Sequence, residues 1–482
     1  MADKAKIIWV YALSALFLAV NFYLVLEKDF YWLFLLPLVL IVVYYYLVSL
    51  DKIILLITFL TPLSVNIRDM EMGLGVALPT EPLMFGVVLI FIANLIFENK
   101  YDRNIARHPI SYIIYFDLLW MLLTTFTSEL PVVSLKHLLS QIWFVVPFYF
   151  VISLMFKDKK KIRNFFWLYL IPLVAVVIYT ITQHAKYGFE EEAGHWVMSP
   201  FYNDHTAYGA ALAIFYPVVI GLIFYPGSSK FSRFSAFVIT IIMTFAIILS
   251  YSRAAWISIA AAFVVFVLVM FKIRFYWVAL ATAVIIGAFV IFQQQIFDVL
   301  EKNKQDSSAN FVEHVRSIAN ISSDASNLER INRWQAALRM AEERPVLGWG
   351  GGTYQFLYAP FQLAKEKTII STNLGDKGNA HSEYLGPLAE MGIPGLLIVL
   401  ILVIVVLYKG LMVYRHSERE EKFLSLMVTL GLVTYFVHGF LNNFLDTDKL
   451  SVPFWGFIAV IVALDVYHTG KPDEAAGENI SN

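Results

Sequence analysis

The sequence predicts an all-α, polytopic transmembrane bundle of 12 to 14 helices with one long helical loop. Of its 482 residues, 59% are hydrophobic and only 15% are charged, whereas soluble domains average about 45–50% apolar and about 25% charged residues. The apolar residues gather in runs of about 20, the length that a helix needs to cross a bilayer. This much apolar surface requires the interior of a membrane as its solvent.

The apolar runs define the predicted helices. The full-length runs are 7–26, 30–50, 82–98, 109–128, 134–156, 163–183, 206–226, 233–250, 254–271, 274–292, 393–413, 421–440 and 451–467. A shorter run, 53–65, is either a short span or a re-entrant segment. The predicted organisation is therefore transmembrane helices 1 to 11 in 1–292, a loop with two or more helices in 293–391, C-terminal transmembrane helices in 392–468, and a disordered tail in 469–482.

The basic residues predict the orientation of these helices. With the N-terminus inside, twenty Lys and Arg residues fall in inner segments and five in the short outer segments. Cytoplasmic loops carry such an excess, and 157–163 is the most basic of them. Both termini are thus predicted to be cytoplasmic, with 293–391, 184–205 and 250–253 together on the outer face.

The outer loop contains its own helix signals. Ser326 and Glu329 have the spacing of a capping box, which predicts a helix that ends before Pro345. Arg330 and Arg333 share one face of that helix. A glycine-rich stretch follows at 348–352, and it predicts a flexible turn without the Lys-Ser/Thr of a phosphate-binding loop.

A second helix is predicted to begin near Asn379, with His381, Tyr384 and Leu385 on one face. The sequence Met391-Gly-Ile-Pro-Gly395 predicts a break before the next span.

Three arginines are candidates for binding an anion. Arg253 lies in a short hairpin between two spans, where it either holds a lipid phosphate or snorkels to anchor a helix end. Guanidinium groups such as those of Arg330 and Arg333 bind phosphate bidentately. The alternative for these two is a solvated helix face paired with glutamates, among them Glu329.

Four further polar residues have both a functional and a structural interpretation. His381 is suited to accept a proton near neutral pH, although a single histidine is often structural. Asn203 and His205 flank Asp204 before a span, where they line a cavity mouth or cap the next helix. Asp117 lies near the middle of a span, where a carboxylate is costly and therefore a functional candidate.

Composition excludes several classes of function. There is no cysteine, which excludes disulfides and thiol catalysis. The net charge of −1 offers no general attraction to nucleic acid. The outer segments contain no HExxH or similar spacing of metal ligands, so no metal is predicted.

Four stretches of the chain resemble the O-antigen ligase/polymerase superfamily, bacterial membrane glycosyltransferases of the GT-C type. These stretches are Ser252-Arg-Ala-Ala-Trp256; 330–337 followed by 344–350; Asn379-Ala-His-Ser-Glu-Tyr-Leu385 running into 390–395; and, more weakly, 201–207. Together they fall within about residues 200–400, the region characteristic of the family.

The resemblance implies a glycosyltransferase of lipopolysaccharide biosynthesis in the bacterial inner membrane. Such enzymes move a glycan from undecaprenyl diphosphate to an acceptor hydroxyl at the periplasmic face, without a cofactor, metal or nucleotide sugar. The family's essential histidine matches His381, and its two arginines match Arg253 and Arg330. Arg333 stands where the family usually has a neutral residue, and it is assigned to substrate binding with Asn203, His205 and Tyr384.

The acceptor is open at this stage. Lipid A–core as acceptor makes the protein an O-antigen ligase, a growing glycan makes it a repeat-unit polymerase, and a protein Ser or Thr makes it a protein O-oligosaccharyltransferase. A polysaccharide flippase or transporter is an alternative from another class. Transporters tend to have charges at the bilayer midplane, and here only Asp117 is clearly central.

Overall fold

The computed structural model describes residues 2–69, 74–97, 101–272, 325–364, 367, 371 and 378–469. Ten helices in this part of the chain are long and apolar enough to cross a membrane, which confirms the predicted polytopic helical bundle. The predicted span 274–292 and the first part of the long loop lie outside the described residues, as does nearly all of the predicted tail.

Residues 1–53 form a unit of their own. It contains α1 (Ala2–Lys28), the 3-10 helix η1 (Trp32–Leu35) and α2 (Leu36–Val48). The predicted span 30–50 is shorter in the structure, because η1 and α2 together cover Trp32–Val48, which is 17 residues, of which α2 supplies 13. Pro37 stands in its first turn, and Ser49 leaves the helical region with φ −155° and ψ 81°.

The short predicted run 53–65 is also less than a full span. Its helix, α3 (Leu50–Leu60), has 11 residues and passes into the 3-10 helix η2 (Thr61–Leu63). Pro62 accounts for the end of α3, since proline cannot donate the next helical hydrogen bond. Both runs are apolar enough for a span but are interrupted before they reach about 20 residues.

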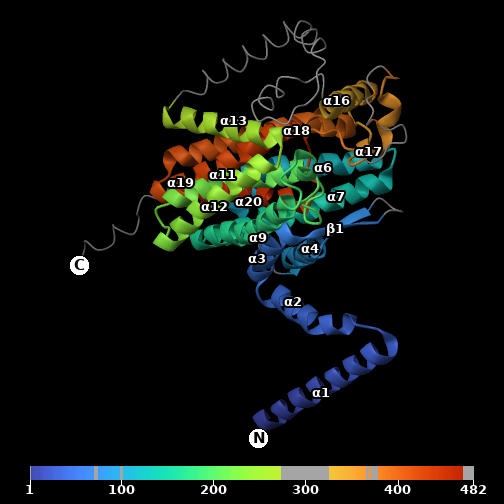
Figure 1. Ribbon diagram of the computed structural model, residues 1–482, viewed down its shortest axis with the longest axis vertical. Helices are drawn as coiled ribbons and strands as arrows, with labels where there is room; N and C mark the ends of the chain where they lie inside the picture. Colours follow the sequence, from blue (N-terminus) through green and yellow to red (C-terminus); the bar gives the residue numbers. More distant parts are fainter. Residues whose placement is uncertain are drawn as a thin grey trace, which may run out of the picture. The chain divides into compact units, whose positions relative to one another are not determined.

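The second unit, residues 54–482, contains the remaining elements. A two-stranded antiparallel sheet precedes a series of helices (Figure 1). The elements are β1 (Val65–Asp69), β2 (Leu74–Leu78), α4 (Thr80–Phe97), α5 (Arg103–Ala106), α6 (Pro109–Phe126), α7 (Pro131–Val145), the π-helix η3 (Val146–Val151), α8 (Ile152–Met155), α9 (Lys159–Ala185), α10 (Glu191–Gly194), α11 (His205–Phe224), α12 (Lys230–Leu249), α13 (Arg253–Met270), α16 (Ala325–Glu343), α17 (Tyr354–Leu357), the 3-10 helix η4 (Ala359–Phe361), α18 (Leu385–His416), α19 (Arg419–His438) and α20 (Asp448–Tyr467).

Helices α19 and α20 form the centre of this unit. Nearly every residue of α20 is buried, and α19 packs against α11, α13, α18 and α20. Gly431 permits the close approach of α19 to α11, because a Cβ there would lie 2.5 Å from the carbonyl oxygen of Ile214. Small residues allow membrane helices to pack closely in this way. This core fixes the C-terminal end of α19, which borders the candidate site.

The predicted break in α18 is confirmed. Gly392 has φ 71° and ψ −169°, so the helix is kinked there. A Cβ at Gly392 would lie 2.3 Å from the carbonyl oxygen of Val346. The amide N–H of Ile393 donates to the carbonyl of Pro345 at 2.8 Å. The kink therefore lets the segment after α16 pack directly on α18.

This packing predicts a stability difference between two glycine variants. Gly392→Ala is expected to destabilise the protein by about 1–3 kcal/mol beyond the backbone cost of a left-handed alanine, because the added methyl collides with backbone. Gly188→Ala is the matched control, since Gly188 has a similar φ of 63° with nothing within 4 Å of its Cβ position. Thermal unfolding of both variants in detergent measures the difference. Equal midpoints would contradict the packing at Gly392.

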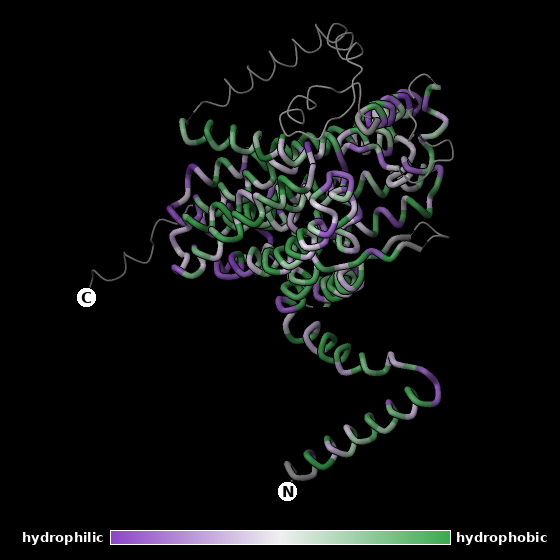
Figure 2. The backbone as a smooth tube through the Cα atoms, in the orientation of Figure 1, coloured by the Kyte–Doolittle hydropathy of each residue, from purple (hydrophilic) through white to green (hydrophobic). Residues whose placement is uncertain are grey.

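The outer helix α16 confirms the predicted helix that ends before Pro345, and Figure 2 shows it as hydrophilic, in contrast to the apolar spans. The side chain of the predicted cap, Ser326, lies outside the described residues. The glycine-rich stretch 348–352 differs from the predicted flexible turn. It is packed against neighbouring helices, and a Cβ at Gly350 would lie 2.1 Å from the hydroxyl of Ser128.

Candidate active site

His381 lies in an irregular segment, 378–384, that leads into α18. The prediction of a helix from Asn379 is wrong, because α18 begins at Leu385. The side-chain oxygen of Asn379 accepts the backbone N–H of His381 at 3.1 Å, and His381 adopts φ 48°. The hydroxyl of Ser382 accepts the N–H groups of Tyr384 and Leu385, each at 3.3 Å. These bonds stop the helix short of His381, whose left-handed backbone is of a kind that clusters at functional sites.

Helix α16 packs against this segment through Arg333 and Trp334. The guanidinium of Arg333 pairs with Glu329 at 2.9 Å and donates to the carbonyl of Asn379 at 3.1 Å. The indole N–H of Trp334 donates to the carbonyl of His381 at 3.4 Å. The predicted partner Glu329 is thus confirmed for Arg333, and the same arginine also positions the His381 segment.

The charges around His381 come from the same helix. Burial, together with the positive charges of Arg333 and Arg330, lowers the pKa of His381 to about 3. Its imidazole is therefore neutral at neutral pH and has a nitrogen available to accept a proton. Asp204 and Asn442 also lie close enough to affect this ring.

Arg253 and Arg330 approach a common point from different elements. Arg253 opens α13, directly after the cap residue Ser252, whose hydroxyl accepts the N–H of Ala255. Both arginines are near enough to His205 for their charges to act on it. The charge of Arg330 also acts on His381. Arg330 from α16 therefore lies near both histidines, and Arg253 from the hairpin lies near His205.

The remaining predicted site residues have mixed roles. Asp204 caps α11 by accepting the N–H groups of Thr206 and Ala207 at 2.7 and 2.9 Å. His205 stacks on His195 with ring centroids 4.3 Å apart. Asn203 and Asp204 also line a cavity, so this motif both caps α11 and borders the cavity.

Tyr384 has a clear structural role. Its hydroxyl donates to the carbonyl of Phe436 at 2.9 Å, and its ring stacks on Phe440 with centroids 4.3 Å apart. These contacts join the start of α18 to the end of α19. The ring also lines the cavity.

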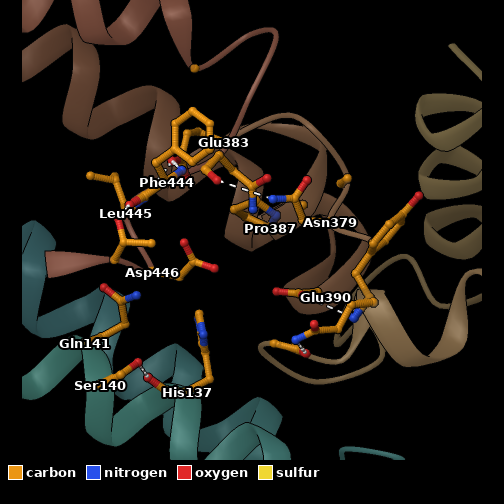
Figure 3. A pocket seen from close by; sticks show the side chains of 18 of the residues that line it. His137, Ser140, Gln141, Asn379, Glu383, Pro387, Glu390, Phe444, Leu445 and Asp446 are labelled. Atoms are coloured by element: carbon orange, nitrogen blue, oxygen red, sulfur yellow. Dashed lines mark hydrogen bonds between the residues drawn. The ribbon is translucent and has the colours of Figure 1, made fainter. Parts of the chain in front are cut away.

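A cavity of about 1030 Å³ opens beside His381. His381, Arg333, Asn203 and Tyr384 line it, together with residues of α6, α7, α17, α18 and α20. In Figure 3, side chains from α7 face the cavity from one side, and those of the 379–390 and 444–446 segments face it from the other. Within the described residues, the lining does not include the side chains of Arg253, Arg330 or His205.

Two residues of this region had no role predicted from the sequence: His438, which lies outside every motif, and Glu383, which lies inside the motif of His381. His438 ends α19, is 1% exposed and contacts Asn442 at 3.2 Å; Arg330 acts on it as well. Glu383 accepts the N–H groups of Phe444 and Leu445 at 2.7 and 3.0 Å. The one available signal was the density of polar residues in 438–448 at the end of an apolar run.

Two carboxyl groups beside the cavity are perturbed by burial. Burial raises the pKa of Glu383 to about 7, although hydrogen bonds from Tyr435 and the backbone oppose the shift. Burial likewise raises the pKa of Asp446 to about 6. Both groups therefore change protonation near neutral pH.

Comparison with known proteins identifies one family. Residues 238–400 match the family model described as O-antigen ligase. The matched region contains Arg253, Arg330, Arg333 and His381, whereas Asn203 and His205 precede it. No curated protein matches the chain.

Proposed function

We propose that this chain, a multi-pass membrane protein of the O-antigen ligase/polymerase superfamily, transfers a glycan from undecaprenyl diphosphate to an acceptor hydroxyl. The observation that supports the proposal is that Arg253 and Arg330, from two separate elements, both lie near His205, and that Arg330 also lies near the neutral His381. The basic inner loops favour an inner-membrane protein with cytoplasmic termini. The site between α13, α16 and α18 then faces the periplasm.

The arginines are assigned to the diphosphate of the donor. Arg253 and Arg330 present guanidinium groups, which bind phosphate oxygens bidentately and keep their charge at any relevant pH. When the glycosidic bond breaks, negative charge develops on the leaving diphosphate oxygen. Preorganised cations at that point stabilise the transition state more than the ground state.

His381 is assigned as the general base. Its neutral imidazole takes the proton of the acceptor hydroxyl as that oxygen attacks the anomeric carbon. The bond from the anomeric carbon to the diphosphate oxygen breaks, and the electron pair leaves with the lipid diphosphate. A single displacement of this kind inverts the anomeric configuration, which NMR of the product linkage measures.

The pKa of His381 predicts a difference between two pH profiles. kcat/KM reports the free enzyme and kcat reports the complex. A bound diphosphate offsets the positive charges that help to lower the pKa of His381, so the pKa is higher in the complex. The acidic limb of kcat is therefore expected at higher pH than that of kcat/KM, measured as initial rates between about pH 2 and pH 9.

Asp446→Asn is the control for this profile, because the pKa of Asp446, which burial raises to about 6, lies within the pH range of the measurement. The separation of the two limbs is expected to persist in that variant. Coincident limbs in the wild-type protein would contradict the assignment of His381 and the two arginines to one diphosphate.

We propose lipid A–core as the acceptor, which makes the protein an O-antigen ligase. A repeat-unit polymerase and a protein O-oligosaccharyltransferase use the same reaction and are the alternatives. The test is transfer in proteoliposomes that contain a polyprenyl-diphosphate glycan and, separately, lipid A–core, a free glycan or a Ser/Thr peptide. Glycosylated lipid A–core, formed equally with and without a chelator, is the expected product. Movement of the intact donor across the bilayer without transfer would indicate a flippase instead.

A further inference from the structure

The cavity continues beyond His381 to a polar wall within the membrane helices. This wall consists of Asp117 on α6 and of His137, Ser140 and Gln141 on α7. His137, Ser140 and Gln141 share one face of α7 by their i, i+3 and i+4 spacing. Figure 3 shows that the side chains of His137 and Gln141 point into the cavity, across from Asp446.

Asp117 and His137 are the members of this wall that are available to a ligand. Both are partly buried, and within the described residues neither the carboxylate of Asp117 nor the ring of His137 has a hydrogen-bonding partner. Nearby Glu390 differs, because its carboxylate accepts the N–H of Tyr354 at 3.0 Å. Polar side chains that line a cavity without a protein partner are free to form hydrogen bonds with a ligand.

A second observation independently indicates a polar ligand. Trp455 on α20 lines the same cavity, is 5% exposed, and has an indole N–H without a hydrogen-bond partner. An aromatic ring beside a carboxylate, an imidazole and an amide gives one apolar face and several hydrogen-bonding groups. Hydroxyl-rich sugars present the complementary surface, whereas a polyprenyl tail would leave the polar groups unsatisfied.

The charge of the cavity narrows the class of sugar. Its lining includes six carboxyl groups but only two basic side chains, Lys136 and Arg333. The carboxyl groups are those of Glu81, Asp117, Asp204, Glu383, Glu390 and Asp446. Two of these carboxyl groups, Glu383 and Asp446, change protonation near neutral pH, and the ionised members of the set repel phosphorylated groups. A neutral or amino sugar fits this lining, and a phosphorylated sugar does not.

We propose that the part of the cavity lined by Asp117, His137 and Gln141 binds the terminal sugar of the acceptor, a neutral or amino sugar, and directs its hydroxyl to His381. The proposal rests on the proposed transfer reaction and assigns the second substrate of the same site. The volume of about 1030 Å³ is at the upper end of the range for drug-sized ligands, about 300–1,000 Å³. The cavity therefore has room for the end of the acceptor glycan. Phosphorylated inner parts of that acceptor remain outside the cavity.

The test is steady-state kinetics of the full chain in proteoliposomes, with donor and acceptor varied separately. Asp117→Asn and Gln141→Ala are each expected to raise the acceptor KM about tenfold, with the donor KM changed less than about twofold, because one hydrogen bond to the acceptor is lost. Gln183→Ala is the matched control, since Gln183 is on α9 and contacts Lys186; it is expected to change neither KM. An increase in the donor KM alone, or no change in either KM, would overturn the proposal.

Binding measured without turnover separates this proposal from the proposed function. Saturation-transfer NMR is expected to show that a neutral oligosaccharide and an amino-sugar oligosaccharide contact the wild-type protein, with the signal lost in Asp117→Asn. If the wild-type protein binds these sugars but transfers no glycan from the lipid diphosphate, the transfer reaction is refuted and the sugar site stands. Equal signals from the wild-type protein and Asp117→Asn, or a preference for a phosphorylated sugar, would refute the sugar site.

Discussion

Replacing His381 by Asn is expected to lower the rate of glycan transfer by about 100- to 10,000-fold, the usual contribution of a positioned general base. Asn is the preferred replacement because it tolerates the left-handed backbone that His381 adopts, with φ 48°. Its amide cannot accept the acceptor proton. Initial rates in proteoliposomes, with both substrates saturating, measure the change.

His416→Asn is the control for this variant. His416 lies near the end of α18, where its ring contacts the carbonyl of Met412 at 2.9 Å, and its replacement is expected to leave transfer unchanged. His438→Gln tests whether another buried histidine supplies the base. Full transfer activity in His381→Asn, or a loss found only in His438→Gln, would refute the role assigned to His381.

The second large effect is expected from the arginines. Arg330→Gln and Arg253→Gln should each lower kcat by about 100- to 1,000-fold, because each removes one cation from the developing diphosphate charge. Arg330→Lys should recover only part of the rate, since an ammonium cannot bind bidentately. The double variant should lose less than the product of the two single losses, because the arginines act on one group.

Arg339→Lys supplies the control on the same helix. The guanidinium of Arg339 donates to the carbonyl of Phe361 at 2.8 Å, so it acts within the outer loop. A loss in Arg339→Lys as large as that in Arg330→Lys would mean that any change in α16 disables the protein. Strictly multiplicative losses for Arg253 and Arg330 would mean that the two arginines act on separate groups.

Most of the fold could be predicted from the sequence because a bilayer imposes a simple rule. A helix that crosses it needs about 20 apolar residues, and the runs that became α4, α9 and α11 satisfy that rule without interruption. The rule failed at α2 and α3, where the helices end at Ser49 and before Pro62. Length of an apolar run does not report such breaks.

The residues of the candidate site could be predicted from the sequence only where they stand in a local motif. The motifs identified Arg253, Arg330 and His381; in the structure Arg330 lies near His381, and both arginines lie near His205. The polar wall at Asp117 and His137 had no such motif, because it forms only when α6 and α7 pack beside α18 and α20. The start of α18 was also missed, since the side chains of Asn379 and Ser382 compete with helical hydrogen bonds.

A structure of the protein with a bound polyprenyl diphosphate tests the central claim most directly. The account predicts phosphate oxygens within hydrogen-bonding distance, about 2.7–3.2 Å, of the guanidinium groups of both Arg253 and Arg330. It also predicts that the His381 ring lies next to the anomeric carbon of the donor, on the side that faces the cavity. A diphosphate held by only one of these arginines, or bound away from His381, would contradict it.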